Sequence, residues 1–295
     1  MTRIGAVSYL NTKPLIYGLR ESLRDGDSLV LNLPSRLAEQ LDRGELDVAL
    51  IPSVEYFRGL ASHRPSDPAA NTGASAANGV SASKSNAGST GSYRVISDAA
   101  IACRGPVWSV RLVSRVPVDK IRTLALDEGS RTSAALVRVL LWQMYRLRPE
   151  TKVLPIEQPP ETADADAMLI IGDRAMHPET GLYEEIWDLG DRWCRHTELP
   201  FVFAMWVARP GVDVDYLIPL LESCRDNGLE AAESIARRYA ASHGLTTEDL
   251  YRYFAENLHF TLGTQERAGL SKFRLGCEEL GLVPASGQQH VRTND

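Results

Sequence analysis

The sequence predicts a two-lobed α/β fold with a central cleft and a helical C-terminal tail. Between Arg3 and Val207, short apolar runs of strand length alternate with amphipathic stretches that carry helix-start and helix-stop residues. Repeated strand–helix–strand units of this kind indicate mainly parallel sheets with both faces covered. The strands fall into two clusters, and from Val214 onward the apolar positions recur at helical spacing. Two clusters predict two lobes, with a cleft between them.

The first cluster contains three expected strands and two expected helices. The strands are short apolar runs at 3–7, 29–33 and 47–52. We expect one helix over 14–19, because proline suits the first helical turn. A second helix is expected over 34–44, where a proline stands at the start and a glycine at the end.

The second cluster is expected to hold one long helix and several strands. A serine caps the helix, which runs from Ser130 to about Leu147. The expected strands are two within 99–116, on either side of Arg104-Gly105-Pro106, and further ones at 121–126, 153–156 and 167–171. Another strand is expected at 201–207, before the tail. In the tail, shared apolar faces predict two helices, one through Leu217, Leu220, Leu221 and Cys224 and one through Leu250, Phe254 and Leu258.

The segment 62–92 differs in composition from the rest of the chain. Of its 31 residues, 22 are Ser, Ala, Gly or Asn, and none is aromatic. Such a segment buries too little apolar surface to offset the entropy of ordering it, so we expect a mobile surface insertion. A lid over a site would need anchoring side chains, which this segment lacks.

Charge and hydropathy exclude several classes of function. The chain has 295 residues, with 32 Lys and Arg against 38 Asp and Glu and a pI near 5.6, which argues against electrostatically driven binding to nucleic acid. No apolar run has the length of a membrane span. The N-terminal residues contain no apolar export core, so the sequence predicts a cytoplasmic protein.

No metal or cofactor is expected. The four cysteines are far apart and form no C-x-x-C pair, and the six histidines show no H-x-x-x-H spacing, so we expect free thiols and no metal site. Cys194 and His196 together offer only two metal ligands, which is too few for a zinc site. Neither a P-loop nor a Gly-x-Gly-x-x-Gly turn follows a strand, which leaves nucleotide cofactors without support. The oligomeric state is left open.

The segment 126–133 (Leu-Asp-Glu-Gly-Ser-Arg-Thr-Ser) predicts an anion-binding helix start. A glycine turn follows a strand, and Ser130 is placed to cap the next helix, where backbone N–H groups are unpaired and the helix dipole is positive. The hydroxyls of Ser130, Thr132 and Ser133 and the cation of Arg131 lie in the same turn. This chemistry suits a carboxylate or a phosphate. A plain N-cap with an exposed arginine explains the same residues.

Three other strand ends carry candidate site residues. Ser8, Tyr9 and Asn11 follow the first strand, where open α/β folds bind ligands, although an Asx turn before Pro14 explains Asn11 as well. Ser109 is either a cleft residue or the solvent-facing member of an alternating strand. Gly172 and Asp173 follow a buried strand, and they either line the cleft or cap the next turn. No Ser–His–Asp grouping or Gly-x-Ser-x-Gly elbow is present, while a carboxylate pair formed in space is left open.

Seven segments, in this order, resemble the chorismate dehydratases of menaquinone biosynthesis. They are Ser-Tyr-Leu-Asn-Thr-Lys-Pro-Leu at 8–15, Leu-Asp-Val-Ala-Leu-Ile-Pro-Ser at 46–53, Gly-Pro-Val-Trp-Ser-Val-Arg-Leu at 105–112, Leu-Asp-Glu-Gly-Ser-Arg-Thr-Ser at 126–133, Ile-Ile-Gly-Asp at 170–173, Asp-Leu-Gly at 188–190 and Leu-Pro-Phe-Val-Phe-Ala at 199–204. The resemblance implies a periplasmic-binding-protein-like fold of type II. It further implies one lobe of residues 1–98 plus 201–295 and a second lobe of residues 99–200.

The family's reaction removes water from chorismate to give 3-[(1-carboxyvinyl)oxy]benzoate, on the futalosine route to menaquinone. By resemblance, the catalytic residues are Asn11 and Ser109, the latter preferred over Ser114 because it lies inside the Gly-Pro-Val-x-Ser-Val match. Asn11 would hydrogen-bond the departing hydroxyl and Ser109 would anchor a carboxylate. Formation of an aromatic ring drives the reaction, so no redox or metal cofactor is required. The proton acceptor is open, with the substrate's own enolpyruvyl carboxylate as one candidate.

Two alternatives share the expected fold. One is a non-catalytic binding protein for an aromatic acid, because fold alone does not define function. The other is an enzyme that resembles 1,4-dihydroxy-6-naphthoate synthase, which acts later in the same pathway. The Ser-Tyr-Leu-Asn and Gly-Pro-Val-x-Ser-Val motifs favour the dehydratase.

Overall fold

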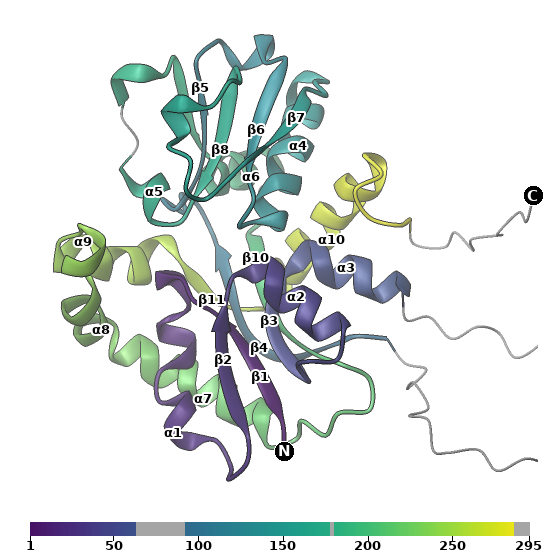
Figure 1. Ribbon diagram of the computed structural model, residues 1–295, viewed down its shortest axis with the longest axis vertical. Helices are drawn as coiled ribbons and strands as arrows, with labels where there is room; N and C mark the ends of the chain where they lie inside the picture. The colour runs from purple at the N-terminus through teal and green to yellow at the C-terminus, as the bar shows by residue number, and fades with distance from the viewer. Residues whose placement is uncertain (63–91, 178–179, 286–295) are drawn as a thin grey trace, which may run out of the picture.

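The computed structural model describes residues 1–62, 92–177 and 180–285. It has two lobes, each built on one β-sheet (Figure 1). The lower lobe in Figure 1 contains a six-stranded sheet with the spatial order β11-β4-β10-β3-β1-β2. These strands are β1 (Arg3–Val7), β2 (Ser28–Asn32), β3 (Val48–Pro52), β4 (Arg94–Cys103), β10 (Phe201–Ala208) and β11 (His259–Thr261).

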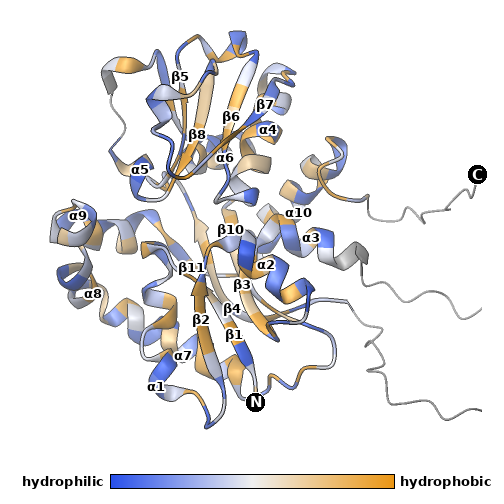
Figure 2. Cartoon of the chain, in the orientation of Figure 1, coloured by the Kyte–Doolittle hydropathy of each residue, from blue (hydrophilic) through white to orange (hydrophobic). Residues whose placement is uncertain are grey.

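The upper lobe contains a five-stranded sheet with the order β7-β6-β8-β5-β9. Its strands are β5 (Val110–Ser114), β6 (Thr123–Asp127), β7 (Glu150–Leu154), β8 (Ala167–Ile171) and β9 (Glu185–Asp188). In Figure 2 the central strands of both sheets are largely hydrophobic, whereas the outer helices mix hydrophilic and hydrophobic residues. This pattern places the core of each lobe at its sheet.

The expectation of mainly parallel sheets is wrong, because both sheets are mixed. β1 runs parallel to β2 and β3, and β6 runs parallel to β7 and β8. β10 enters the lower sheet antiparallel between β3 and β4, and β5 lies antiparallel between β8 and β9. β10 returns from the other lobe, so no crossover helix connects it to a neighbouring strand of its sheet. It can therefore run antiparallel to its neighbours. The short strands β9 and β11 were not predicted, because neither segment shows a clear alternation of apolar and polar residues.

Helices cover both sheets. In the lower lobe they are α1 (Leu19–Ser22), α2 (Pro34–Asp42), α3 (Ser53–Ser62), α7 (Leu217–Glu230), α8 (Ala232–Tyr239), α9 (Thr247–Arg252), a π-helical turn (Tyr253–Asn257) and α10 (Thr264–Glu279). In the upper lobe they are α4 (Arg131–Tyr145), α5 (Asp173–Met176) and α6 (Leu189–Thr197). Single 3₁₀ turns occur at Leu10–Thr12, Pro14–Ile16, Val118–Lys120, Pro160–Thr162, Thr180–Leu182 and Ala241–His243. Within the described residues, no helix is long and apolar enough to cross a bilayer.

The expected helix over 14–19 is not continuous. The chain forms two 3₁₀ turns, Leu10–Thr12 and Pro14–Ile16, and then the short helix α1. Between them Gly18 has a φ of +71°, in the left-handed region that an α-helix does not contain. The glycine therefore breaks the helix that the proline was expected to start.

The chain passes between the lobes at two points. It leaves the lower sheet after Cys103 and returns to it at Phe201. The expected boundary at residue 98 therefore falls inside β4, whereas the one at residue 200 coincides with the start of β10. The assignment of whole segments to lobes, 1–98 with 201–295 and 99–200, stays a prediction. The expected insertion at 62–92 lies outside the described residues, except for Ser62 and Ser92.

An aromatic cluster packs where the chain re-enters the lower lobe. Trp193 on α6, Phe201 on β10 and Phe273 on α10 are fully buried, with ring centroids 4.8 to 5.9 Å apart. Edge-to-face packing of this kind adds to the free energy of burial. The cluster joins the upper lobe to the C-terminal helix.

Phe273→Ala is expected to lower the free energy of unfolding by about 3–5 kcal/mol, because it opens a cavity in this cluster. Urea denaturation followed by circular dichroism measures the loss. Leu275→Ala is the matched control, since Leu275 lies on the same helix and is 62% exposed. Equal losses in the two variants would contradict a stabilising role for the cluster.

Candidate active site

A cleft between the lobes brings together most of the predicted site residues. It is lined by strand ends and loops from both lobes, namely Val7, Tyr9, Asn11, Pro34, Pro52, Ile101, Val107, Ser109, Val110, Ser130, Ser133, Ile171, Gly172, Phe203, Ala204 and Leu258. Of the predicted residues, Tyr9, Asn11, Ser109, Ser130, Ser133 and Gly172 line this cleft. Ser8, Arg131, Thr132 and Asp173 do not. Asn11 and the first turn of α4 thus share one cavity.

Asn11 is held by the 3₁₀ turn that follows β1. Its neighbours Leu10 and Thr12 are buried, which fixes the turn on the lower lobe. The Thr12 hydroxyl donates a hydrogen bond of 3.2 Å to Oδ1 of Asn11. Among the described residues, Nδ2 of Asn11 has no hydrogen-bond partner, so this donor is available to a ligand in the cleft.

The N-terminus of α4 faces Asn11 from the upper lobe. Oγ of Ser130 accepts a hydrogen bond of 3.2 Å from the backbone N–H of Ser133, and its hydroxyl donates to Oγ of Ser133 at 2.8 Å. Both hydroxyls lie at the positive end of the helix dipole. The predicted N-cap is therefore confirmed, and it opens into the cleft.

Tyr9 reaches across the cleft to the turn before α4. A Cβ on Gly129 would lie 2.6 Å from the Tyr9 hydroxyl oxygen, so any larger residue there requires the Tyr9 side chain or the turn to shift. Burial, with the nearby Asp127 carboxylate, raises the pKa of Tyr9 to about 12. The phenol is therefore protonated at neutral pH and is a hydrogen-bond donor.

Ser109 is positioned by a strained turn. Trp108 has a φ of +64°, and the Asp188 carboxylate accepts hydrogen bonds from the backbone N–H groups of Val107 (2.9 Å) and Trp108 (2.6 Å). The backbone N–H of Gly172 donates to the Ser109 carbonyl at 2.9 Å. Ser109 is 3% exposed and precedes β5, so the alternative of a solvent-facing strand residue is wrong. Backbone strain of this kind clusters at functional sites.

Tyr253 is a site-related residue that the sequence did not reveal. It lies in the π-helical turn, is almost completely buried, and donates a hydrogen bond of 2.8 Å to Oγ of Ser109. Burial raises its pKa, so the phenol is a permanent donor. It keeps the Ser109 hydroxyl proton free for a ligand. In the sequence, Tyr253 is an aromatic residue on an apolar helix face. That pattern is the same for a core residue, so it does not indicate a site residue.

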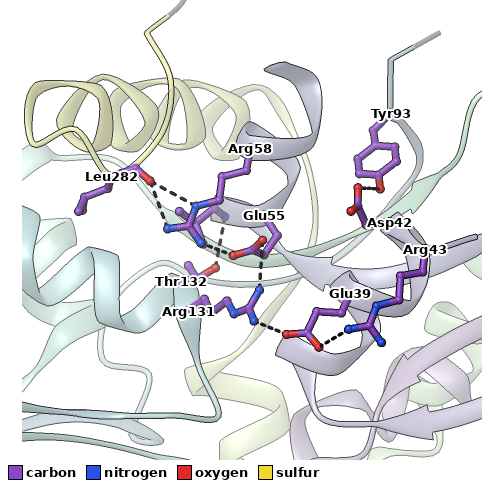
Figure 3. A network of polar contacts seen from close by, with 10 residues as sticks. Glu39, Asp42, Arg43, Glu55, Arg58, Tyr93, Arg131, Thr132 and Leu282 are labelled. Atoms are coloured by element: carbon purple, nitrogen blue, oxygen red, sulfur yellow. Dashed lines mark hydrogen bonds and ion pairs between the residues drawn. The ribbon is translucent and has the colours of Figure 1, made fainter. Parts of the chain in front are cut away.

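Arg131 and Thr132 point away from the cleft, toward helices of the lower lobe (Figure 3). The Arg131 guanidinium lies 2.5 Å from Oε1 of Glu39 on α2 and 3.4 Å from Oε2 of Glu55 on α3. Oγ1 of Thr132 is 3.5 Å from Oγ of Ser53 and accepts a 3.4 Å hydrogen bond from the Val54 N–H. These contacts join the lobes. They leave the cleft without the cation that the sequence placed there.

Ser8 and Asp173 also lie outside the cleft lining. Ser8 is exposed, and its backbone N–H donates to the Asn32 carbonyl at 3.1 Å. Oδ2 of Asp173 lies 3.5 Å from Nε2 of His243, which belongs to the lower lobe. Asp173 thus contacts the opposite lobe beside the cleft.

The cleft is narrow and uncharged. Its volume is about 50 Å³, below the roughly 300–1,000 Å³ of typical ligand pockets, so the lobes must separate to admit a substrate. Among the described residues that line it, none is ionised, and the polar groups are hydroxyls, an amide and backbone N–H groups. Across the described residues, no cluster of three or more His, Cys, Asp or Glu side chains is placed to hold a metal.

Comparison with known proteins identifies the family. The family model described as menaquinone biosynthesis matches residues 2–63 and 80–279. The chain belongs to this family. A chorismate dehydratase of Thermus thermophilus is 28% identical over 301 aligned positions, covering 95% of each chain. A second chorismate dehydratase, from Campylobacter jejuni, is 25% identical and covers 95% of this chain and 99% of the relative.

Solved structures show the fold of this menaquinone biosynthesis protein. Protein AF1704 of Archaeoglobus fulgidus aligns with a TM-score of 0.68 at 16% identity, covering 96% of this chain and 98% of that one. The periplasmic aliphatic sulphonate binding protein SsuA of Escherichia coli aligns with a TM-score of 0.58 at 14% identity, covering 96% and 94%. The fold is therefore the expected periplasmic-binding-protein-like one.

Gly129→Ala is expected to push the lobes apart, because its Cβ would overlap the Tyr9 hydroxyl across the cleft. Small-angle X-ray scattering should show a larger radius of gyration, and the double variant with Tyr9→Phe should restore the original value. Gly105→Ala is the control, since nothing lies within 4 Å of its Cβ position. An unchanged radius in Gly129→Ala would show that the contact does not set the lobe spacing.

Proposed function

We propose that this protein is a chorismate dehydratase, which eliminates water from chorismate to give 3-[(1-carboxyvinyl)oxy]benzoate. The observation that carries the proposal is the similarity, over nearly the whole chain, to two chorismate dehydratases within the menaquinone biosynthesis family. The cleft supports it, because Asn11 and Ser109 line one cavity with the N-terminus of α4. The cytoplasmic location stays a prediction.

The chemistry of the cleft suits a dianion that becomes aromatic. Chorismate carries two carboxylates, and the hydroxyls and backbone N–H groups at the start of α4 are neutral donors for an anion. In our proposal the lobes close on the substrate, exclude water and hold it in a reactive conformation. The substrate then loses its ring hydroxyl and the hydrogen on the neighbouring ring carbon. The aromatic ring of the product supplies the driving force.

Two residues have proposed roles in this elimination. Nδ2 of Asn11 donates a hydrogen bond to the departing hydroxyl and stabilises the charge that develops on it. Ser109 donates its hydroxyl proton to a substrate carboxylate, while Tyr253 holds its oxygen in place. No histidine or ionised side chain is among the described residues lining the cleft. We therefore assign the proton first to the substrate's own enolpyruvyl carboxylate, which then passes it to the departing hydroxyl, so that water leaves and the carboxylate is regenerated.

The deciding experiment incubates the purified protein with chorismate and follows the products by mass spectrometry. A dehydratase forms a product lighter than chorismate by one water. A binding protein would return chorismate unchanged, and that outcome would refute the proposal. Turnover of the later pathway substrate in place of chorismate would instead indicate the 1,4-dihydroxy-6-naphthoate synthase reaction.

Asn11→Ala is expected to lower kcat by roughly 100-fold or more, as for the loss of one electrostatic stabiliser of a transition state. Steady-state kinetics with chorismate measures the effect. Asn227→Ala is the matched control, because Asn227 is exposed on α7 and does not line the cleft. Near-normal turnover of Asn11→Ala would remove Asn11 from the mechanism.

Tyr253→Phe is expected to lower kcat/KM about threefold to tenfold, because the variant leaves Oγ of Ser109 without its buried donor. The phenyl ring preserves the packing against Trp108, whose ring centroid is 5.8 Å away. Tyr251→Phe, at an exposed position two residues earlier, should match the wild type. If both variants behave alike, Tyr253 does not position Ser109.

A further inference from the structure

Two cysteine side chains meet near the points where the chain passes between the lobes. Cys103 is the last residue of β4 in the lower lobe, and Cys194 lies on α6 in the upper lobe. In the sheet, Cys103 is paired with Phe201, the residue at which the chain returns to the lower lobe. Neither cysteine is among the described residues that line the cleft with Asn11, and the reaction proposed above uses neither.

One face of α6 brings the two thiols into contact. A Cβ on Gly190 would lie 2.7 Å from Sγ of Cys103, so the missing side chain lets this thiol touch the helix. Residues four apart in a helix lie on one face, which places Cys194 one turn further along the face that contains Gly190. Sγ of Cys194 lies 4.0 Å from the carbonyl oxygen of Cys103. The contact between β4 and α6 therefore contains both sulfur atoms.

The two thiols differ in exposure and in acidity. Cys103 is fully buried, whereas Cys194 is partly exposed. A hydrogen bond between the two side chains lowers the pKa of Cys194, although its own burial opposes this shift. The same hydrogen bond, together with burial, raises the pKa of Cys103. Because the thiolate is the nucleophile, Cys194 is the thiol that an oxidant from solution reaches and that reacts first.

The other two cysteines of the chain are unreactive by the same criteria. Cys224 on α7 and Cys277 on α10 are both buried. Burial raises the pKa of Cys224 to about 11 and that of Cys277 to about 12, so both thiols are protonated at neutral pH. We expect them to stay reduced under conditions in which Cys194 reacts.

We propose that Cys103 and Cys194 are a redox-active thiol pair, which a hydroperoxide converts to an intramolecular disulfide. The structure contains both residues as free thiols, which is the reduced form of the pair. Since Cys103 belongs to β4 of the lower lobe and Cys194 to α6 of the upper lobe, the disulfide links the lobes covalently.

The oxidation has two steps. The Cys194 sulfur attacks one oxygen of the hydroperoxide and the O–O bond breaks, which leaves a sulfenic acid on Cys194. The other oxygen leaves as water or an alcohol and takes the Cys194 thiol proton. The Cys103 sulfur then attacks the Cys194 sulfur and the S–O bond breaks, so hydroxide leaves with the Cys103 proton as water. The two thiols together lose two electrons, which reduce the peroxide.

The test treats the purified full chain with a small molar excess of hydrogen peroxide and then removes the oxidant with catalase. The chain is unfolded, its free thiols are alkylated with N-ethylmaleimide, and intact mass spectrometry counts the labels. The reduced chain, which has four cysteines, should take up four labels, and the oxidised chain should take up two. A digest without reductant should contain one linked pair of peptides, in which Cys103 is joined to Cys194.

Two variants control for the identity of the pair. Cys194→Ser should label at every remaining cysteine with or without peroxide, because Cys103 then has no partner thiol. Cys224→Ser is the matched control, since it removes a cysteine outside the pair and should form the disulfide as readily as the wild type. Circular dichroism checks that both variants are folded. Loss of the disulfide in a folded Cys224→Ser variant would contradict the assignment.

The folded chain should form the disulfide at least about tenfold faster than the chain in concentrated urea, because the fold holds the two thiols in contact. Equal rates would overturn the proposal. Full labelling after oxidation, a disulfide between other cysteines or between two chains, or over-oxidised Cys194 without a link would overturn it as well. No turnover is measured, so failure here leaves the proposed dehydratase function standing.

Discussion

The cleft depends on the way the N-terminus of α4 is held against the lower lobe. Arg131 binds carboxylates of α2 and α3, and Thr132 contacts the start of α3. These contacts, together with the close approach of the Tyr9 hydroxyl to Gly129, restrict the position of the start of α4 relative to the lower lobe. Its unpaired N–H groups and hydroxyls are therefore directed at the cavity that contains Asn11.

The same contacts explain how a neutral cleft serves an anion. A cation in the cavity would bind the substrate carboxylates tightly in the ground state as well as in the transition state. Because binding that is equal in both states does not raise kcat, such a cation would not speed the reaction. Here the Arg131 charge is neutralised outside the cavity by two glutamates. What faces the substrate is the partial charge of the helix dipole and a set of fixed hydrogen-bond donors, which require no reorganisation during the reaction.

The opposite wall of the cleft is built around one strained residue. Trp108 adopts a left-handed conformation because Asp188 accepts hydrogen bonds from its N–H group and from that of the preceding residue. The turn buries Ser109 against Tyr253, which comes from the C-terminal tail. Arg111 also contacts this turn, because its Nε donates a hydrogen bond of 3.2 Å to the Trp108 carbonyl.

Local sequence patterns determined much of this protein. The strands β1, β3, β8 and β10, the helix α4 with its Ser130 cap, and the placement of Asn11 after a strand were predicted, because each depends on residues adjacent in the chain. The fold and the family were likewise recognised from ordered motifs and are confirmed by the comparisons.

Tertiary structure alone decided the rest. The antiparallel insertion of β10, the turn of Arg131 away from the cleft toward Glu39 and Glu55, and the contact of Tyr253 with Ser109 all join residues distant in sequence. A local pattern shows that Arg131 is a cation at a helix start, but it does not show which carboxylates the other lobe brings near. Partners across a lobe junction are set by packing, which no single segment encodes.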